Sequence, residues 1–126
     1  MNSCVENIFK RGVKHFNNHE YYAAHECFEE IWTDHKIKDR VFVQSLIQLS
    51  VAYFHITNLN KNGAISLFEK SVKKLEKYLN RKTEIDNIGN VVIAAKMSLD
   101  NVIKISDMNL FNWNLAPKLE IKKNIK

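Results

Sequence analysis

Three side chains of this sequence have the types and the spacing to do chemistry together: His25, Glu29 and His55. His25 and Glu29 are four residues apart, so in a helix they stand one turn apart and can share a ligand. Two imidazoles and one carboxylate are donors that suit zinc or ferrous iron. The sequence therefore contains a candidate divalent-metal site with these three residues as its ligands.

A polar stripe runs along one of the most apolar parts of the chain, residues 38–58. At roughly 100° per residue, Gln44, Gln48 and His55 fall within about 40° of one another on a helix. An unpaired polar group in a protein interior costs roughly 1–3 kcal/mol, so these side chains need polar neighbours. The preceding helical segment offers the side with His25 and Glu29, and we expect the two stripes to meet.

Three interpretations of this polar cluster are open. The first is a structural hydrogen-bond network that fixes how the two helices pack. The second is the metal site, which in an enzyme would point to a metal-assisted hydrolase. The third is a small-molecule pocket in which Tyr21 and Trp32 form walls while Gln44 and Gln48 orient the ligand. The alternative to an enzyme is a non-catalytic helical interaction module.

The spacing of apolar residues predicts the helices that must position these side chains. The expected ranges are 5–16, 20–34, 38–58, 64–79 and 86–105, with Asp86 as the cap of the last one. Helix 38–58 is apolar almost all round and is expected at the centre of the fold. On helix 20–34, His25 is expected in the middle of the buried side and Cys27 on the opposite side. No segment repeats at a fixed period.

These elements predict an all-α protein, a compact antiparallel bundle of about five helices. Residues 1–105 are expected to form a single domain, with the polar cluster between its second and third helices. Residues 106–126 are expected to form an extended C-terminal tail that packs its aromatic side chains and then frays.

Composition restricts the partners of this chain. Its net charge is +5, but its 16 Lys stand against only 3 Arg, a bias typical of A/T-rich genomes, so nucleic acid is not expected as a partner. No stretch has the roughly 20 apolar residues of a membrane span. Cys4 and Cys27 lie far apart in the sequence and form no CxxC motif, so we expect two reduced thiols and a protein of a reducing compartment. We expect a soluble protein of the cytoplasm, or of the plastid stroma if it is plastid-encoded, with a small molecule or a protein as its partner.

The residues from about 9 to 80 resemble the family of domain of unknown function 309. The resemblance lies in an H-x-x-x-E-x-x-W signature, here His25, Glu29 and Trp32, followed by a glutamine-bearing helix and the pair Gly63 and Ala64. It implies an all-helical fold and a signature that binds a metal, with no reaction established. The three signature residues are the site that the resemblance implies.

Overall fold

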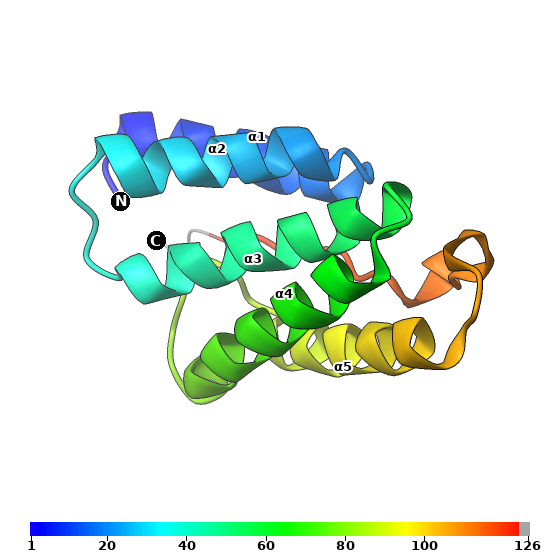
Figure 1. Cartoon of the computed structure of the whole chain (residues 1–126). Helices are drawn as coiled ribbons and strands as arrows, with labels where there is room; N and C mark the ends of the chain where they lie inside the picture. Colours follow the sequence, from blue (N-terminus) through cyan, green and yellow to red (C-terminus); the bar gives the residue numbers. More distant parts are fainter. Residues whose placement is uncertain (124–126) are drawn as a thin grey trace.

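A computed structural model describes residues 1–123 of the chain, and five α-helices account for most of it (Figure 1). The helices are α1 (Ser3–Asn17), α2 (Tyr21–Asp34), α3 (Arg40–Thr57), α4 (Lys61–Leu75) and α5 (Ile88–Lys104). Three short 3-10 helices follow α4 and α5: η1 (Glu76–Tyr78), η2 (Met108–Leu110) and η3 (Trp113–Leu115). Among the described residues the only β pairing is an isolated bridge between Ile85 and Ile121. The prediction of an all-α bundle of five helices is confirmed.

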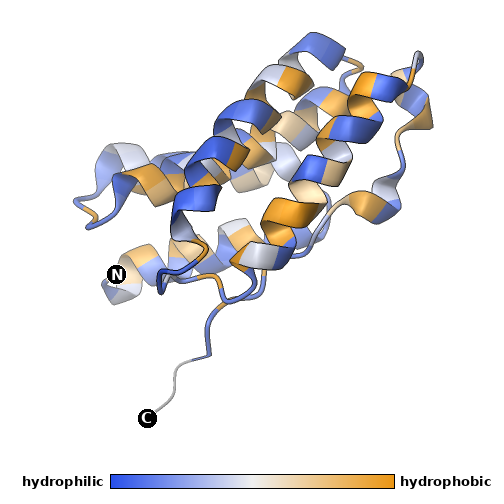
Figure 2. Cartoon of the chain, turned by 90° about the horizontal axis from the view of Figure 1, so that it is seen from below, coloured by the Kyte–Doolittle hydropathy of each residue, from blue (hydrophilic) through white to orange (hydrophobic). Residues whose placement is uncertain are grey.

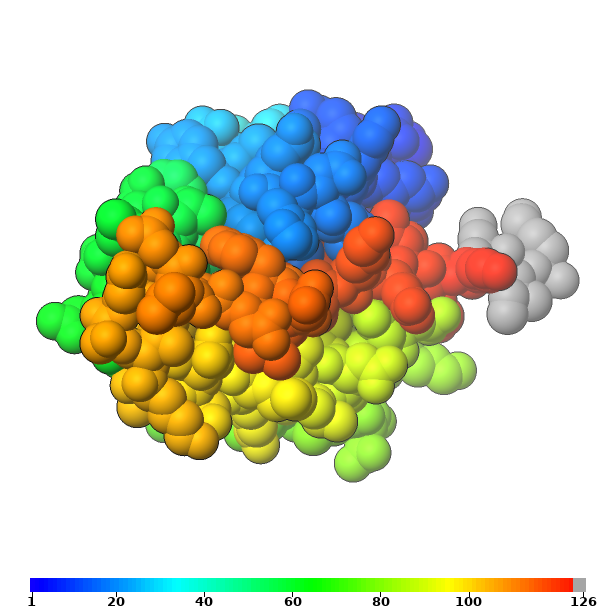
Figure 3. Space-filling model, turned by 90° about the vertical axis from the view of Figure 1, so that its right-hand side faces the viewer, coloured from blue at the N-terminus to red at the C-terminus, as the bar shows by residue number. Residues whose placement is uncertain are grey.

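The helices form two layers. α3 lies between α2 and α4 and contacts both, and these three helices make the front layer in Figure 1. α1 packs behind α2, and α5 packs behind α4. The C-terminal segment runs between α1 and α5, where Figure 3 shows it as an orange and red strip between the blue and yellow parts of the surface. Consequently α3 is central, as predicted, but one of its sides faces outward.

The core lies between the layers and is rich in aromatic rings. Tyr53 of α3 is fully buried and packs its ring against Phe16 of α1, Tyr21 of α2 and Phe68 of α4. Its hydroxyl lies 2.8 Å from that of Ser98 in α5. Apolar and hydrophilic residues alternate along each helix in Figure 2, as expected for helices with one buried side. This one tyrosine therefore connects α3 to each of the other four α-helices.

The first two helical hairpins are built alike, although the sequence analysis found no repeat. In the α1–α2 turn, Glu20 N donates to His15 O and His19 N to Phe16 O; in the α3–α4 turn, Asn60 N donates to His55 O and Leu59 N to Ile56 O. His19 and Leu59 both have left-handed backbone angles, φ 60° and 59°. Identical residues stand 40 positions apart in the two hairpins: His15 and His55, Asn18 and Asn58, Ala24 and Ala64, Phe28 and Phe68, Glu29 and Glu69. Only these few positions match, so the repeat is weak in sequence and clear in structure.

The second half of the chain departs from the prediction in two details. Asn87 rather than Asp86 precedes α5, and Asp86 instead belongs to the short pairing with the C-terminal segment, in which its backbone N–H donates to Glu120 O. The C-terminal segment is partly helical and firmly attached: Met108, Phe111 and Leu119 are buried, and Asn17 makes two hydrogen bonds to the backbone of Leu119. The predicted frayed end, residues 124–126, lies outside the described residues. None of the helices described is both long and apolar enough to cross a membrane.

Candidate functional site

The buried side of α2 is rotated from the one that the helical wheel predicted. Its buried residues are Tyr21, Ala24, Cys27, Phe28 and Ile31, so Cys27 points inward and His25 lies at the edge of the buried side. The reason is the close approach of α1. A Cβ atom on Gly12 would lie only 2.8 Å from the Phe28 ring and 3.1 Å from Cys27, so the bare backbone of α1 covers this part of α2. His25 is consequently left beside α3 and partly open to solvent.

His25 and Glu29 form the expected pair across one helical turn. His25 Nε2 lies 3.0 Å from Glu29 Oε2, and the side chains are 21% and 52% exposed, so the pair is accessible from solvent. The other ring nitrogen, Nδ1, lies 3.0 Å from the carbonyl oxygen of Tyr22. A carbonyl oxygen can only accept, so Nδ1 carries the proton of that bond. The ring is thus held in one orientation, with Nε2 directed at the carboxylate.

Aromatic and basic side chains from α2 and α3 surround this pair. The exposed ring of Tyr22 packs 5.0 Å from the His25 ring and 5.2 Å from the ring of Phe54 in α3. The indole N–H of Trp32 donates to Arg40 O over 3.1 Å, and the Arg40 guanidinium lies 4.2 Å above the indole ring, a cation–π contact. We call the surface formed by these six residues the α2–α3 face: Tyr22, His25, Glu29, Trp32, Arg40 and Phe54.

His55, the third predicted metal ligand, does not join the pair. It lies at the end of α3, where its Nδ1 is 3.3 Å from Asn60 Nδ2, and its ring packs beside Gly63. It is therefore part of the α3–α4 turn, as His15 with its bond to Glu20 is part of the α1–α2 turn. Among residues 1–123, no three His, Cys, Asp or Glu side chains are grouped so that they could hold a metal ion.

The other residues assigned to the site have separate places. Tyr21 belongs to the core: its ring is only 2% exposed and stacks on Tyr53 at 5.1 Å. Burial raises the pKa of the Tyr21 phenol far above its usual value, and its hydroxyl has no hydrogen-bond partner among the described residues. Gln44 and Gln48 are half-buried on α3. In the described structure neither glutamine is hydrogen-bonded to the pair, and the buried Gln48 Oε1 accepts no hydrogen bond at all.

Three residues of the α2–α3 face were missed by the sequence analysis: Tyr22, Arg40 and Phe54. Tyr22 had a usable signal, because it falls about 60° from His25 on the helical wheel. Arg40 and Phe54 had none, because their contacts depend on how the loop between α2 and α3 aligns the two helices. Within the α2–α3 face, the contact between the two helices and the residues His25, Glu29 and Trp32 were predicted, and the other three members were not.

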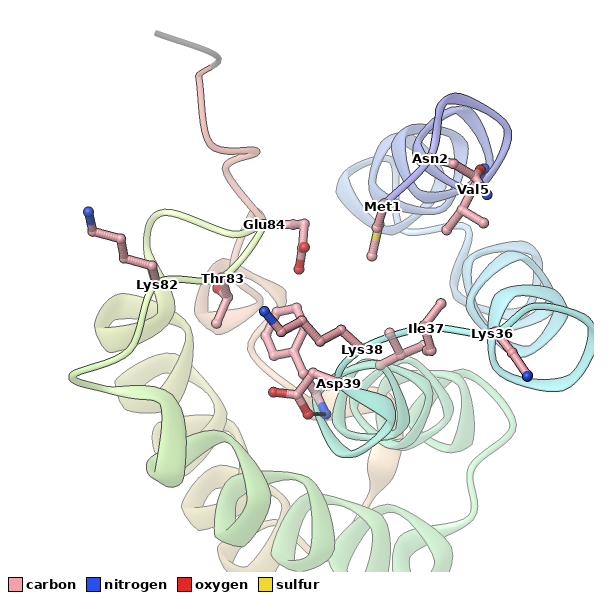
Figure 4. A pocket seen from close by; sticks show the side chains of 12 residues that line it. Met1, Asn2, Val5, Lys36, Ile37, Lys38, Asp39, Lys82, Thr83 and Glu84 are labelled. Carbon is pink, nitrogen blue, oxygen red and sulfur yellow. Dashed lines mark hydrogen bonds between the residues drawn. The ribbon is translucent and has the colours of Figure 1, made fainter.

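A cavity lies elsewhere, between the start of α1 and the start of α3 (Figure 4). It has a volume of about 560 Å³ and is lined by the start of α1, residues 36–39 before α3 and residues 82–84. Lys38 and Glu84 reach into it, whereas Lys36 and Lys82 point away. No residue of the α2–α3 face lines this cavity. The hydrogen bonds and ring contacts described above fix the side chains of the α2–α3 face.

Comparison with known proteins gives one positive result. A family model described as "Domain of unknown function (DUF309)" matches residues 9–67. The match extends from the middle of α1 into α4 and includes every residue of the α2–α3 face. A search among curated proteins found no match.

Proposed function

We propose that this chain, which matches the family model of domain of unknown function 309 over residues 9–67, is a non-catalytic interaction module that docks a partner on the α2–α3 face. One observation carries this proposal. The signature residues lie at the edge of α2 that borders α3, where Glu29 is exposed and His25 and Trp32 are half-buried, whereas other residues of the helix fill the core. A signature needed only for packing would be fully buried, and a polar and aromatic set that stays open to solvent suggests recognition.

The composition of the α2–α3 face suits a protein partner. Tyrosine, tryptophan and arginine contribute most often to the energy of protein interfaces. Here the Trp32 indole is held by its hydrogen bond and by the guanidinium above it, and the His25 ring is held by Tyr22 O. Side chains fixed before binding lose less conformational entropy when the partner arrives. The face is therefore prepared to bind without rearrangement.

The test is capture of a partner by the folded chain. Immobilised wild-type protein, His25→Ala, Trp32→Ala and Ile93→Ala are exposed to an extract of the source cells, and bound proteins are identified by mass spectrometry. Ile93 is exposed on α5, so Ile93→Ala is the control for a surface change elsewhere. We expect a protein retained by the wild type and by the control, and lost from both α2 variants. Retention that is equal on all four proteins would contradict the proposal.

A second candidate function, binding of a divalent cation, has its own support in the geometry of the pair. Two ligands about 2.1 Å from a cation and about 90–110° apart lie about 3.0–3.4 Å from each other. His25 Nε2 and Glu29 Oε2 are 3.0 Å apart, and Nδ1 donates to a backbone carbonyl, as metal-bound histidines commonly do. The pair thus fits two ligands of zinc or ferrous iron, while His55 does not fit as the third. Two protein ligands do not make a hydrolase, and this proposal stops at binding.

Zinc titration by calorimetry tests the second candidate. The background carries Cys4→Ser, because the exposed Cys4 thiol could bind zinc itself. His25→Ala and Glu29→Gln should abolish the binding heat. His15→Ala is the matched control, because His15 also pairs with a glutamate, Glu20 at 2.9 Å in the α1–α2 turn, but lies outside the signature. Absent binding, or binding lost equally in the control, would remove the cation from consideration.

A further inference from the structure

Charge is strongly separated between two helices of the front layer. α2 contains no Lys or Arg, and exposed carboxylates line its outer side: Glu26, Glu29, Glu30 and Asp34. The outer side of α4 and η1 carries the opposite charge: Lys70, Lys73, Lys74 and Lys77. We call these two sets the acidic face and the lysine face. Within residues 1–123 no ion pair engages any of the four lysines, and Glu29 is the one carboxylate of the acidic face that has a partner, His25.

The ammonium groups of the lysine face repel one another. The pKa of Lys74 is lowered, first by its partial burial and then by the charges of Lys70, Lys77 and Lys73. These four ammonium groups thus share two helical turns, and the nearby carboxylates form no ion pair with them in the described structure, because Glu76 pairs with Lys96 and Glu69 with none of the four. A partner that brings carboxylates to this surface would relieve that repulsion.

The two faces flank a third surface of different character. α2 and α4 pack on opposite sides of α3, and Figure 1 shows the three helices across the front of the molecule. The outward side of α3 is half-buried and largely apolar at its centre, with Ile47, Val51 and Phe54. Moving across the front layer, a partner would meet carboxylates, then an apolar strip, then ammonium groups. An apolar centre with a charged rim is the usual anatomy of a protein interface.

We propose that the partner of this surface is a second copy of the chain, related by a twofold axis that lies parallel to α3. This inference rests on the proposed function and names the partner. Rotation by 180° about such an axis places α2 of each copy over α4 of the other, so the acidic and lysine faces meet twice. The two α3 strips pack on each other at the centre. A twofold axis in the same plane but perpendicular to α3 would set α2 against α2, and like charges would oppose it.

Charge-swap variants test this arrangement by sedimentation equilibrium. One variant carries Glu26→Lys and Glu30→Lys, which leaves the His25–Glu29 pair intact, and the other carries Lys70→Glu and Lys74→Glu. In each variant alone the changed face carries two charges of each sign, so both contacts lose their net attraction, and we expect association to weaken by about 100-fold or more in about 0.1 M salt. In a 1:1 mixture of the two variants, one contact again joins an unchanged acidic face to an unchanged lysine face, and the other joins the two changed faces, whose swapped residues have opposite charges. The mixture should therefore recover a dimer that neither variant forms.

Two controls complete the design. The double variant Lys14→Glu with Lys118→Glu changes the net charge by the same amount as Lys70→Glu with Lys74→Glu, but away from the front layer. It should dimerise as strongly as the wild type. Raising the salt from about 0.1 to about 1 M shortens the screening length from about 10 to about 3 Å and should weaken the wild-type dimer. Circular dichroism of each variant establishes that its helices are intact.

The outcomes are separable from those of the proposed function. A wild-type protein that is monomeric in low salt, swap variants that remain dimeric, or a mixture that does not associate would each overturn the dimer. If the chain is monomeric while His25→Ala and Trp32→Ala still lose a captured protein, the α2–α3 face binds a different partner. If the lysine swap instead abolishes binding of the monomer to heparin, the lysine face serves a polyanion and the dimer is wrong.

Discussion

Gly12 has no side chain, so α1 can approach α2 closely at this position. This contact leaves His25 beside α3 and partly exposed to solvent. A Cβ atom at this position would lie 2.8 Å from Cε1 of Phe28, a ring that is fully buried and packed against Phe9. Because that ring has no free space to enter, Gly12→Ala should lower the free energy of unfolding by about 1–3 kcal/mol. Urea denaturation measures this change.

Gly89 provides the matched control for this substitution. It lies in the first turn of α5, and a Cβ atom there would meet nothing within 4 Å. Alanine favours the helix over glycine, so Gly89→Ala should be neutral or stabilising by up to about 1 kcal/mol. Equal effects at both positions would mean that the contact with Phe28 does not set the distance between α1 and α2.

Tyr78 connects η1 to the start of α3 and makes stability depend on alkaline pH. Its hydroxyl donates to Asp39 Oδ1 over 2.6 Å, and Asp39 also caps α3 by accepting from Phe42 N. Burial, followed by the hydrogen bond to Asp39 and its charge, raises the pKa of Tyr78 from 10.0 to about 12. A pKa that is higher in the folded state means that the phenol contributes fully below pH 10 and loses its contribution as pH rises towards 12.

Tyr78→Phe tests this pH dependence. Near neutral pH the variant should be less stable than the wild type by about 1 kcal/mol, the usual net value of one hydrogen bond. Above pH 10 the difference in the free energy of unfolding should shrink, because the wild type must then ionise or unfold. A difference that stays constant up to pH 12 would show that Tyr78 does not titrate with unfolding.

At the scale of elements, the hairpin turns show how the two halves of the front layer are fixed. His19 and Leu59 hold equivalent left-handed positions, at which glycine is the residue without steric cost. Leu59 is 55% exposed, so Leu59→Gly should relieve strain and stabilise the chain by about 0.5–1 kcal/mol. His19 stacks its ring on Tyr21 at 5.4 Å and packs on Trp113, so His19→Gly should gain less or lose stability. Thermal denaturation of both variants gives the comparison, and equal gains would mean that the His19 contacts contribute nothing.

The helices and the His25–Glu29 pair could be predicted because they depend on local spacing. Apolar periodicity located all five helices, and a separation of four residues is enough to join a histidine and a glutamate in any helix. The direction in which His25 points could not be predicted, because it depends on the contact of Gly12 with Phe28 across two helices. The place of His55 could not be predicted either, because its role in the α3–α4 turn becomes evident only from its structural likeness to His15.

At the scale of the whole molecule, the C-terminal segment joins the two helices of the back layer, α1 and α5. Asn17 and Asn87 hold it from α1 and from the start of α5 with two hydrogen bonds each, to the backbone at Lys118, Leu119 and Glu120. Trp113 lies over Tyr21 and Phe111, so the segment also covers the aromatic core. It acts as part of the back layer, in the space that α1 and α5 leave between them (Figure 3).

Removal of residues 106–126 should therefore disrupt the fold of residues 1–105. The buried side chains of Met108, Phe111 and Leu119 each stabilise the fold by about 1.5–3 kcal/mol, which together approaches the whole stability of a typical domain. We expect the fragment 1–105 to keep helical circular dichroism but to lose its cooperative urea transition. A chain that ends at residue 123 keeps every described contact and should unfold like the full chain. A fragment 1–105 with a transition as steep and as late as that of the full chain would instead identify it as an independent domain, with the tail as an addition to it.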